Sequence, residues 1–434
     1  MGHSFAPCAE GEVGARPGLR PQSVLLVLVA LAPYDGLLLI ADLPRLADAW
    51  KEALVAFAFG LTVLDSPGRR PRTDRPPWAV PLALLVLWSV GSVAIHPSLQ
   101  SLLGFKISYT FLLIPLSLYA NPFDARDRDR LVSLLMINGV VTSVIGIAQQ
   151  FVGHEALAEM GYPYNEVIRF SNDYLRSFST FNQPFPFAFF VMIVVLVGLP
   201  VALEDRGRRR NRLFLLALPI LAVGMSTAIV RGAFLGLLIG LVYLGMVRYR
   251  VLGHGLFAVP VIVVVLVATG AGGAVFSASS LQERVSGWVT EVGDQGVHPV
   301  GEGIGSTGAA AELLETNASG GGGSLLSSNG EAQRYQADNQ YVKTWIELGP
   351  IGLWLLLWVL GAAAVDGHRR ARALAISNEP FAVSTDTGLA HGIVAATLAP
   401  IGAATVATYW EIFPVDLVFW LLLGVSTSLR SRSF

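Results

Sequence analysis

Hydrophobic residues occur in long, nearly uninterrupted blocks along this chain, and short polar segments separate the blocks. Many blocks approach the roughly 20 residues that a helix needs to cross a bilayer. The strands of a membrane β-barrel show alternating segments of about 10 residues instead. The pattern therefore predicts an all-α polytopic membrane protein with about twelve transmembrane helices. Their expected positions are 23–41, 46–64, 78–95, 101–120, 130–151, 184–203, 212–229, 231–247, 251–275, 343–365, 389–409 and 412–429.

Two of the polar segments are much longer than the others. One covers about 152–183 and lies inside the region 23–275, which holds the first nine helices. The other, 276–342, lies between helices nine and ten and contains ASGGGGSLLSSNG, which lacks the apolar side chains needed to pack a core. A polar tail, residues 1–22, precedes the first helix. Residues 343–434 contain the last three predicted helices.

Composition agrees with a membrane protein, because 53% of the residues are hydrophobic and only 14% are charged. Soluble domains usually carry about 25% charged residues. The single cysteine, Cys8, excludes an intrachain disulfide and a cysteine-based metal site. We interpret the first apolar block as the first membrane helix rather than a cleaved signal peptide.

The distribution of Lys and Arg predicts the orientation, since these residues accumulate on the cytoplasmic side. With a cytoplasmic N-terminus, alternate connections and both termini hold 21 of the 30 Lys and Arg residues. The segments 152–183 and 276–342 are then extracytoplasmic, at a cell inner (plasma) membrane. Nine basic residues remain that topology does not explain: Arg45, Lys51, Lys106, Arg169, Arg176, Arg231, Arg284, Arg334 and Lys343.

Two of these arginines lie where a polar segment meets a predicted helix. Arg176 begins RSFSTFNQPFPFAFF, eight residues before Pro184, and proline suits a helix start. Arg231 lies in STAIVRGAFLG, between two apolar helices with almost no loop, where an arginine normally faces protein or a water-filled cavity. The simpler alternatives are an interfacial arginine for Arg176 and a turn residue for Arg231.

The long segment 276–342 supplies further candidates. Arg284 lies near its start, and the glycine-rich stretch GEGIGSTG follows, which by itself is more typical of a flexible turn than of a phosphate site. The segment holds eight acidic residues and two arginines, so any anion site must use a few focused arginines, whereas acidic and amide groups suit sugars.

The return to the membrane, QADNQYVKTWIELGPIGLW, carries Asp338, Asn339 and Lys343. On a helix, Asn339, Lys343 and Glu347 would share one face. Gly349-Pro350 would separate a short helix from the span that follows. Asp338 and Asn339 also suit helix capping, since both side chains accept hydrogen bonds from free backbone amides.

These stretches together resemble the O-antigen ligase and polymerase superfamily of polytopic glycosyltransferases, and the likeness covers most of the chain in layout. RSFSTFNQPFPFA is similar to the family's Arg, Thr-Phe, Pro pattern before a span, and STAIVRGAFLG to its Arg-Gly pattern. GEGIGSTG followed by DNQYVKTWIELGPIGLW is similar to its loop exit. Ligases usually have a His-Asn pair where this chain has Asp338-Asn339, which favours an exopolysaccharide repeat-unit polymerase.

The resemblance implies transfer or polymerisation of a glycan from a polyprenyl-pyrophosphate-linked donor onto an acceptor sugar at the extracytoplasmic face. Asp338 would orient or deprotonate the acceptor hydroxyl, and Arg231, Arg176 and Arg284 would hold the pyrophosphate. Asn339, Lys343 and Lys106 complete the candidate substrate contacts. We expect no metal and no cofactor, and as partners the lipid-linked donor, a glycan acceptor, membrane lipid and other polysaccharide-assembly proteins, with no nucleic acid.

Three alternatives stay open. One is an O-antigen ligase that transfers the glycan to a lipid or glycan acceptor. A second is a transporter of a small anion or other solute, although no internal repeat of the kind common in transporters is visible. A third is a non-catalytic scaffold, which would leave Arg231 without a role.

Overall fold

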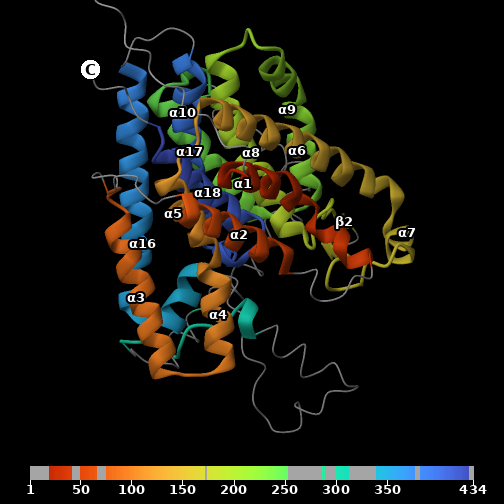
Figure 1. Ribbon diagram of the computed structural model, residues 1–434. Coiled ribbons are helices and arrows are strands. Elements are labelled where there is room, and N and C mark those ends of the chain that lie inside the picture. The colour runs from red at the N-terminus through yellow and green to blue at the C-terminus, as the bar shows by residue number, and fades with distance from the viewer. Residues whose placement is uncertain are drawn as a thin grey trace, which may run out of the picture.

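A computed structural model describes residues 19–41, 49–65, 75–171, 174–252, 299–311, 339–376 and 382–429, with residues 286 and 288. The described chain is mostly helical, as the apolar blocks predict (Figure 1). Its helices are α1 (Pro21–Leu31), η1 (Ala32–Ile40), α2 (Trp50–Asp65), α3 (Ala79–Ile95), α4 (Leu99–Tyr109), η3 (Thr110–Leu112), α5 (Leu113–Ala120), α6 (Ala125–Val152), α7 (His154–Glu159), α8 (Pro184–Glu204), α9 (Arg209–Thr227), α10 (Arg231–Val247), α16 (Gln340–Ile376), α17 (Ala382–Ala403), η5 (Tyr409–Glu411) and α18 (Val415–Ser426).

Five stretches of the described chain are long and apolar enough to cross a membrane: Pro21–Ile40, Leu99–Ala120, Ala125–Val152, Pro184–Glu204 and Gln340–Ile376. Ala79–Ile95, Arg231–Val247 and Val415–Ser426 are shorter apolar helices. The structure thus supports a membrane protein without establishing the count of twelve spans. The predicted ninth span, 251–275, falls almost wholly outside the described residues.

Helix α8 forms the centre of the bundle. Its most apolar stretch is 89% buried within the protein, against 44–50% for the other four long stretches. It packs against α6, α9, α10 and α17. A helix that is apolar all round is stable in this position, because protein covers every face.

Small residues bring the central helices close together. A Cβ atom at Gly388 or Gly392 of α17 would come within 2.7–2.8 Å of the α8 backbone. On α10, Gly232 and Gly236 lie in the same way against residues of α8 and of the α17 end. The spacing of four residues places each pair on one helix face, so the glycines of STAIVRGAFLG serve helix packing, as their spacing predicts.

Several predicted spans are not single α-helices. The span 23–41 passes from α1 into the 3-10 helix η1. The span 101–120 is broken at η3, because Pro115 has no N–H to donate to the carbonyl of Phe111. The predicted eleventh span, 389–409, ends as a helix at Ala403. Residues 404–414 instead form an irregular segment that contains η5, which a membrane protein tolerates where the backbone is buried in protein or lines a cavity.

Arg-rich connections that the distribution of Lys and Arg predicts to be cytoplasmic contact each other. The Arg128 guanidinium donates to both carboxylate oxygens of Asp386, at 2.8 and 2.6 Å, and joins the first turn of α6 to the start of α17. Arg210 at the start of α9 contacts Asp129 on α6. The helices of these connections therefore share one end of the bundle.

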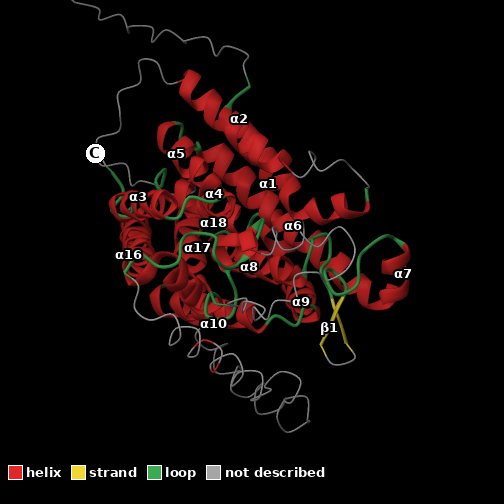
Figure 2. Ribbon diagram, turned by 90° about the horizontal axis from the view of Figure 1, so that it is seen from below, coloured by secondary structure: helices red, strands yellow, loops and turns green. Residues whose placement is uncertain are grey.

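A short antiparallel hairpin of β1 (Arg169–Ser171) and β2 (Tyr174–Arg176) lies within the segment 152–183. Arg169 pairs with Arg176 in its register. The hairpin and α7 lie at one edge of the bundle (Figure 2).

Candidate functional site

A cavity of about 570 Å³ opens where several connections between helices meet, at the end of the bundle away from the Arg-rich connections. Its walls come from the start of α2, from α4 and η3, from the segment before α8, from the loop 299–311, and from 404–416. Its lining residues are Lys51, Glu52, Lys106, Ile107, Thr110, Phe111, Glu166, Arg169, Asn182, Gln183, Phe185, Pro186, Gly308, Ala309, Val406, Ala407, Thr408, Glu411, Ile412, Phe413 and Asp416.

Charges of both signs line this cavity. Lys106 forms an ion pair with Glu52, with 2.7 Å between nitrogen and oxygen, and Lys51 lies 3.5 Å from Asp35 and over the ring of Phe413. The remaining cation is Arg169, whose Nε donates to the carbonyl of Glu166 at 3.0 Å. Within the part of the chain that the structure describes, no carboxylate pairs with Arg169. Its guanidinium is therefore the lining cation most available to an anion.

Arg176 and Arg231 lie at one turn beside the cavity. The Arg176 Nε donates to the carbonyl of Ala228 at 3.1 Å, in the turn between α9 and α10, and its guanidinium lies 5.0 Å from the ring centre of Phe185. Arg231 is the first residue of α10. Gly232 packs against Val406, and both Val406 and Phe185 line the cavity.

The backbone around the site is strained. Asn165, Ser179 and Ile229 are the non-glycine residues with a positive φ in the described chain, at 68°, 55° and 52°. Asn165 precedes the lining residue Glu166, and Ile229 lies two residues before Arg231. Asparagine adopts the left-handed conformation readily, whereas it costs most other L-residues about 1–2 kcal/mol and is a true outlier for the β-branched Ile229. Such strain clusters at functional sites, where the surrounding packing maintains it.

The loop 299–311, drawn in teal beside α3 and α4 in Figure 1, is docked on a kink in α16. Gly349 has φ 67°, and Pro350 has no N–H, so carbonyls before the kink lose their helical donors. Glu302 N donates to Ile346 O at 2.8 Å, Gly303 N donates to Glu347 O at 3.2 Å, and Trp88 Nε1 donates to Leu348 O at 2.9 Å. The predicted break at Gly349-Pro350 is thus confirmed, and it is the platform for the loop.

A buried ion cluster of Lys343, Glu347 and Glu411 lies against this loop. Lys343 Nζ contacts the carboxylate of Glu347, one turn along α16, and that of Glu411 at 2.9 Å, and all three side chains are 2–4% exposed. Glu347 accepts from Gly305 N at 2.9 Å, and Glu411 accepts from Ala309 N at 3.1 Å. The cluster therefore ties the loop to α16 and η5.

The glycines of GEGIGSTG fit this tight docking. Gly301, Gly303, Gly305 and Gly308 all have a positive φ, between 75° and 109°. A Cβ at Gly305 would lie 2.5 Å from the carbonyl oxygen of Gln100. The stretch is a turn, as expected, and backbone bonds, buried carboxylates and close packing hold it against α16 and α4.

The structure places the predicted site residues in three groups. Lys106 lines the cavity, and Arg176 and Arg231 lie beside it. Asn339 and Lys343 lie behind its wall. Lys343 is in the ion cluster, and the Asn339 side-chain oxygen caps α16 by accepting from Tyr341 N and Val342 N. Asp338 and Arg284 lie outside the described residues.

Sequence reasoning missed several residues of the site. Arg169 and Lys51 were among the nine basic residues that topology left unexplained, which was the available signal. Glu52 and Glu411 gave no signal, because only the folded chain brings them beside Lys106 and Lys343. Neither a scan against models of protein families nor a search of curated proteins gives a match for this chain.

Proposed function

We propose that this protein is a metal-independent membrane glycosyltransferase that extends a polysaccharide from a polyprenyl-pyrophosphate-linked donor at the extracytoplasmic face. The observation that carries the proposal is the meeting of Arg176 and Arg231 at one strained turn beside the charged cavity. These two arginines come from separate connections. A pyrophosphate needs several cations from different directions, and arginine forks bind its oxygens in a bidentate manner.

The cavity suits the sugar end of such a donor. Its volume of about 570 Å³ is within the range of small-molecule sites, roughly 300–1,000 Å³. Asn182, Gln183, Thr110 and Thr408 supply amides and hydroxyls that can pair with sugar hydroxyls. Arg169 adds a third cation, and the resemblance adds Arg284.

The reaction uses these groups in one displacement. The acceptor hydroxyl oxygen attacks the anomeric carbon of the donor, and the bond from that carbon to the pyrophosphate oxygen breaks. The proton of the hydroxyl passes to a carboxylate, which we assign to Asp338, the residue immediately before Asn339. The arginines hold the leaving polyprenyl pyrophosphate as its negative charge develops.

Lys343 and Asn339 act by position in this proposal rather than by contact with the substrate. The ion cluster holds the loop whose Gly308 and Ala309 line the cavity. The Asn339 cap fixes the start of α16, directly after the proposed base. The orientation rests on the positive-inside pattern, because the cavity lies away from the Arg-rich connections.

Purified protein incubated with a lipid-linked repeat unit, followed by sizing of the products, tests the function. We expect a series of glycan products, each longer than the single repeat unit that the donor carries. Transfer of a single unit to a lipid acceptor would favour the O-antigen ligase. An unchanged donor, together with solute uptake by vesicles that contain the protein, would favour a transporter and overturn the proposal.

A further inference from the structure

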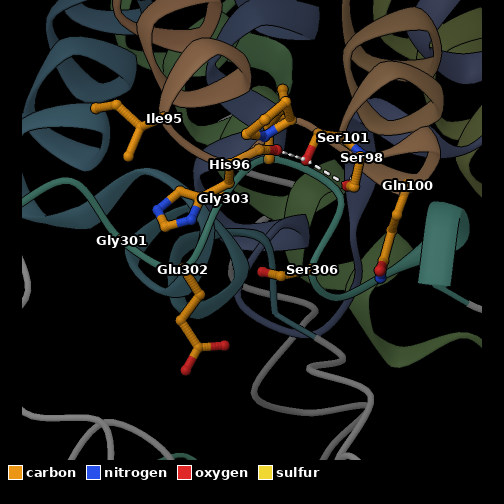
Figure 3. Close-up of a pocket in the computed structure, with 11 residues that line it drawn as sticks. Ile95, His96, Ser98, Gln100, Ser101, Gly301, Glu302, Gly303 and Ser306 are labelled. Atoms are coloured by element: carbon orange, nitrogen blue, oxygen red, sulfur yellow. Dashed lines mark hydrogen bonds between the residues drawn. The ribbon is translucent and has the colours of Figure 1, made fainter.

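A second cavity, of about 690 Å³, lies between the α3–α4 connection and the loop 299–311 (Figure 3). Its lining residues are Ile95, His96, Pro97, Ser98, Gln100, Ser101, Gly301, Glu302, Gly303, Ile304 and Ser306. None of these eleven is lysine or arginine, so the pocket has no side chain that favours a phosphate. One imidazole and one carboxylate are also fewer ligands than a protein zinc site uses.

The polar groups of this pocket suit a ligand with many hydroxyls. The Ser306 hydroxyl oxygen is shielded from solvent and has no hydrogen-bond partner within the described residues. Gln100 Nε2 donates to Gly305 O at 2.8 Å, which holds the amide group in place. His96 from the α3–α4 connection and Glu302 from the loop 299–311 both line the pocket, and the Glu302 carboxylate points outward from the loop (Figure 3). Together they offer hydrogen-bond donors and acceptors.

The two cavities share two walls. On α4, Gln100 and Ser101 line the second pocket, and Lys106 and Ile107 line the charged cavity. Six residues of helix span about 9 Å. In the loop 299–311, residues 301–304 and Ser306 line the second pocket, and Gly308 and Ala309 line the charged cavity. The loop packs against α4 at Gly104 and Gly305, between the two cavities. A glycan of several sugars that occupied both cavities would pass around this contact.

We propose that the pocket of His96, Gln100, Glu302 and Ser306 is a subsite for a neutral saccharide unit of the glycan, away from the bond that is formed. The proposal rests on the proposed function for its biological meaning. The binding chemistry of the pocket stands on its own residues. Its rigid loop lets the protein hold a sugar there with little loss of backbone freedom on binding.

Binding of neutral saccharides tests the subsite directly. The probe is a set of linear tetra- to hexasaccharides of glucose, galactose or mannose, without lipid or phosphate, titrated into the purified full chain in nanodiscs and followed by saturation-transfer NMR. We expect Glu302→Gln and His96→Ala each to raise the dissociation constant about tenfold, as loss of one strong hydrogen bond does. Both residues are exposed, so the variants should fold. The matched control Glu159→Gln, on exposed α7, should bind like the unchanged protein.

Equal binding by all variants, or no binding of any probe, overturns the subsite. Transfer assays separate this result from failure of the proposed function. If both hold, the pocket variants raise KM for long acceptors and leave kcat and the use of single-sugar acceptors unchanged. If saccharides bind in the pocket but no glycan is transferred, the subsite stands and the proposed function fails. If glycan is transferred with no effect of the variants, the subsite alone fails.

Discussion

Lys343 on α16 and Glu411 on η5 form an ion pair of 2.9 Å in which both side chains are 2% exposed. Glu347 completes the pair from one helical turn further along α16. Two carboxylates and one ammonium group leave an excess negative charge, which the amides of Gly305 and Ala309 offset by donating hydrogen bonds. The stability of the loop 299–311 thus depends on a lysine that does not reach the cavity.

Replacement of Lys343 by methionine tests this dependence. Two buried carboxylates would lose their cation, and removal of one partner from a buried ion pair costs about 3–5 kcal/mol. We expect a lower thermal unfolding midpoint in detergent and cleavage within 299–311 by added protease. Lys106→Met is the matched control, because the Lys106 side chain is 51% exposed and such pairs contribute at most about 1 kcal/mol. Equal loss of stability in the two variants would contradict the account.

Gly305→Ala tests the docking of the loop separately from charge. At φ 83° an added Cβ meets the Gln100 carbonyl oxygen, so we expect a loss of about 2 kcal/mol or more in the free energy of unfolding. Gly361 lies within α16 with no atom within 4 Å of an added Cβ. Gly361→Ala should therefore stabilise the protein by about 0.5–1 kcal/mol. Thermal unfolding measures the stability of both variants. An unchanged stability of Gly305→Ala would contradict the close packing of the loop against α4.

Arg169→Ala tests the cavity cation that no described carboxylate neutralises. A hydrogen bond to a charged group contributes about 1.5–3 kcal/mol, so we expect KM for the lipid-linked donor to rise tenfold or more. Arg169→Lys should recover part of the loss, because it restores one charge without the fork. Arg206→Ala, an exposed arginine in the connection between α8 and α9, should behave like the unchanged protein. Steady-state kinetics at varied donor concentrations measure KM for each variant. An unchanged KM in Arg169→Ala would show that Arg169 does not contact the donor.

Asp338→Asn tests whether Asp338 is the base. Asparagine keeps the size of aspartate but cannot accept the proton, and Asn339 still caps α16, so the rate at saturating donor should fall about 100-fold or more, with stability near that of the unchanged protein. Asp338→His introduces the residue of the ligase branch and should retain part of the activity. Full activity in Asp338→Asn would exclude Asp338 as the base and move the search to Glu411 or Glu166, which line the cavity.

Local features of the fold were predictable from the sequence because they depend on nearby residues. Proline and glycine positions predict the start of α8 at Pro184 and the kink at Gly349. The lengths of the apolar blocks predict the very short connection before Arg231. The common face of Asn339, Lys343 and Glu347 follows from helical spacing, and the structure confirms it in the Lys343–Glu347 pair.

The rest depended on contacts between distant parts of the chain. Residues 404–414 are apolar enough to predict membrane helix, yet they pack against other helices or line the cavity, and hydropathy does not distinguish these cases from a membrane span. The pairing of Glu52 with Lys106 and of Lys343 with Glu411 leaves no periodic signal. The positions of Arg176 and Arg231 were predictable one by one, but their meeting at the turn before α10 was not.

The most direct test of the central claim is the release of polyprenyl pyrophosphate by purified protein supplied with a lipid-linked oligosaccharide donor and a glycan acceptor. We predict one polyprenyl pyrophosphate for each glycosidic bond formed, little turnover by Arg231→Lys, and none by a folded Arg231→Ala variant, since lysine lacks the bidentate fork. An intact donor with the unchanged protein, or normal turnover by Arg231→Ala, would contradict the account.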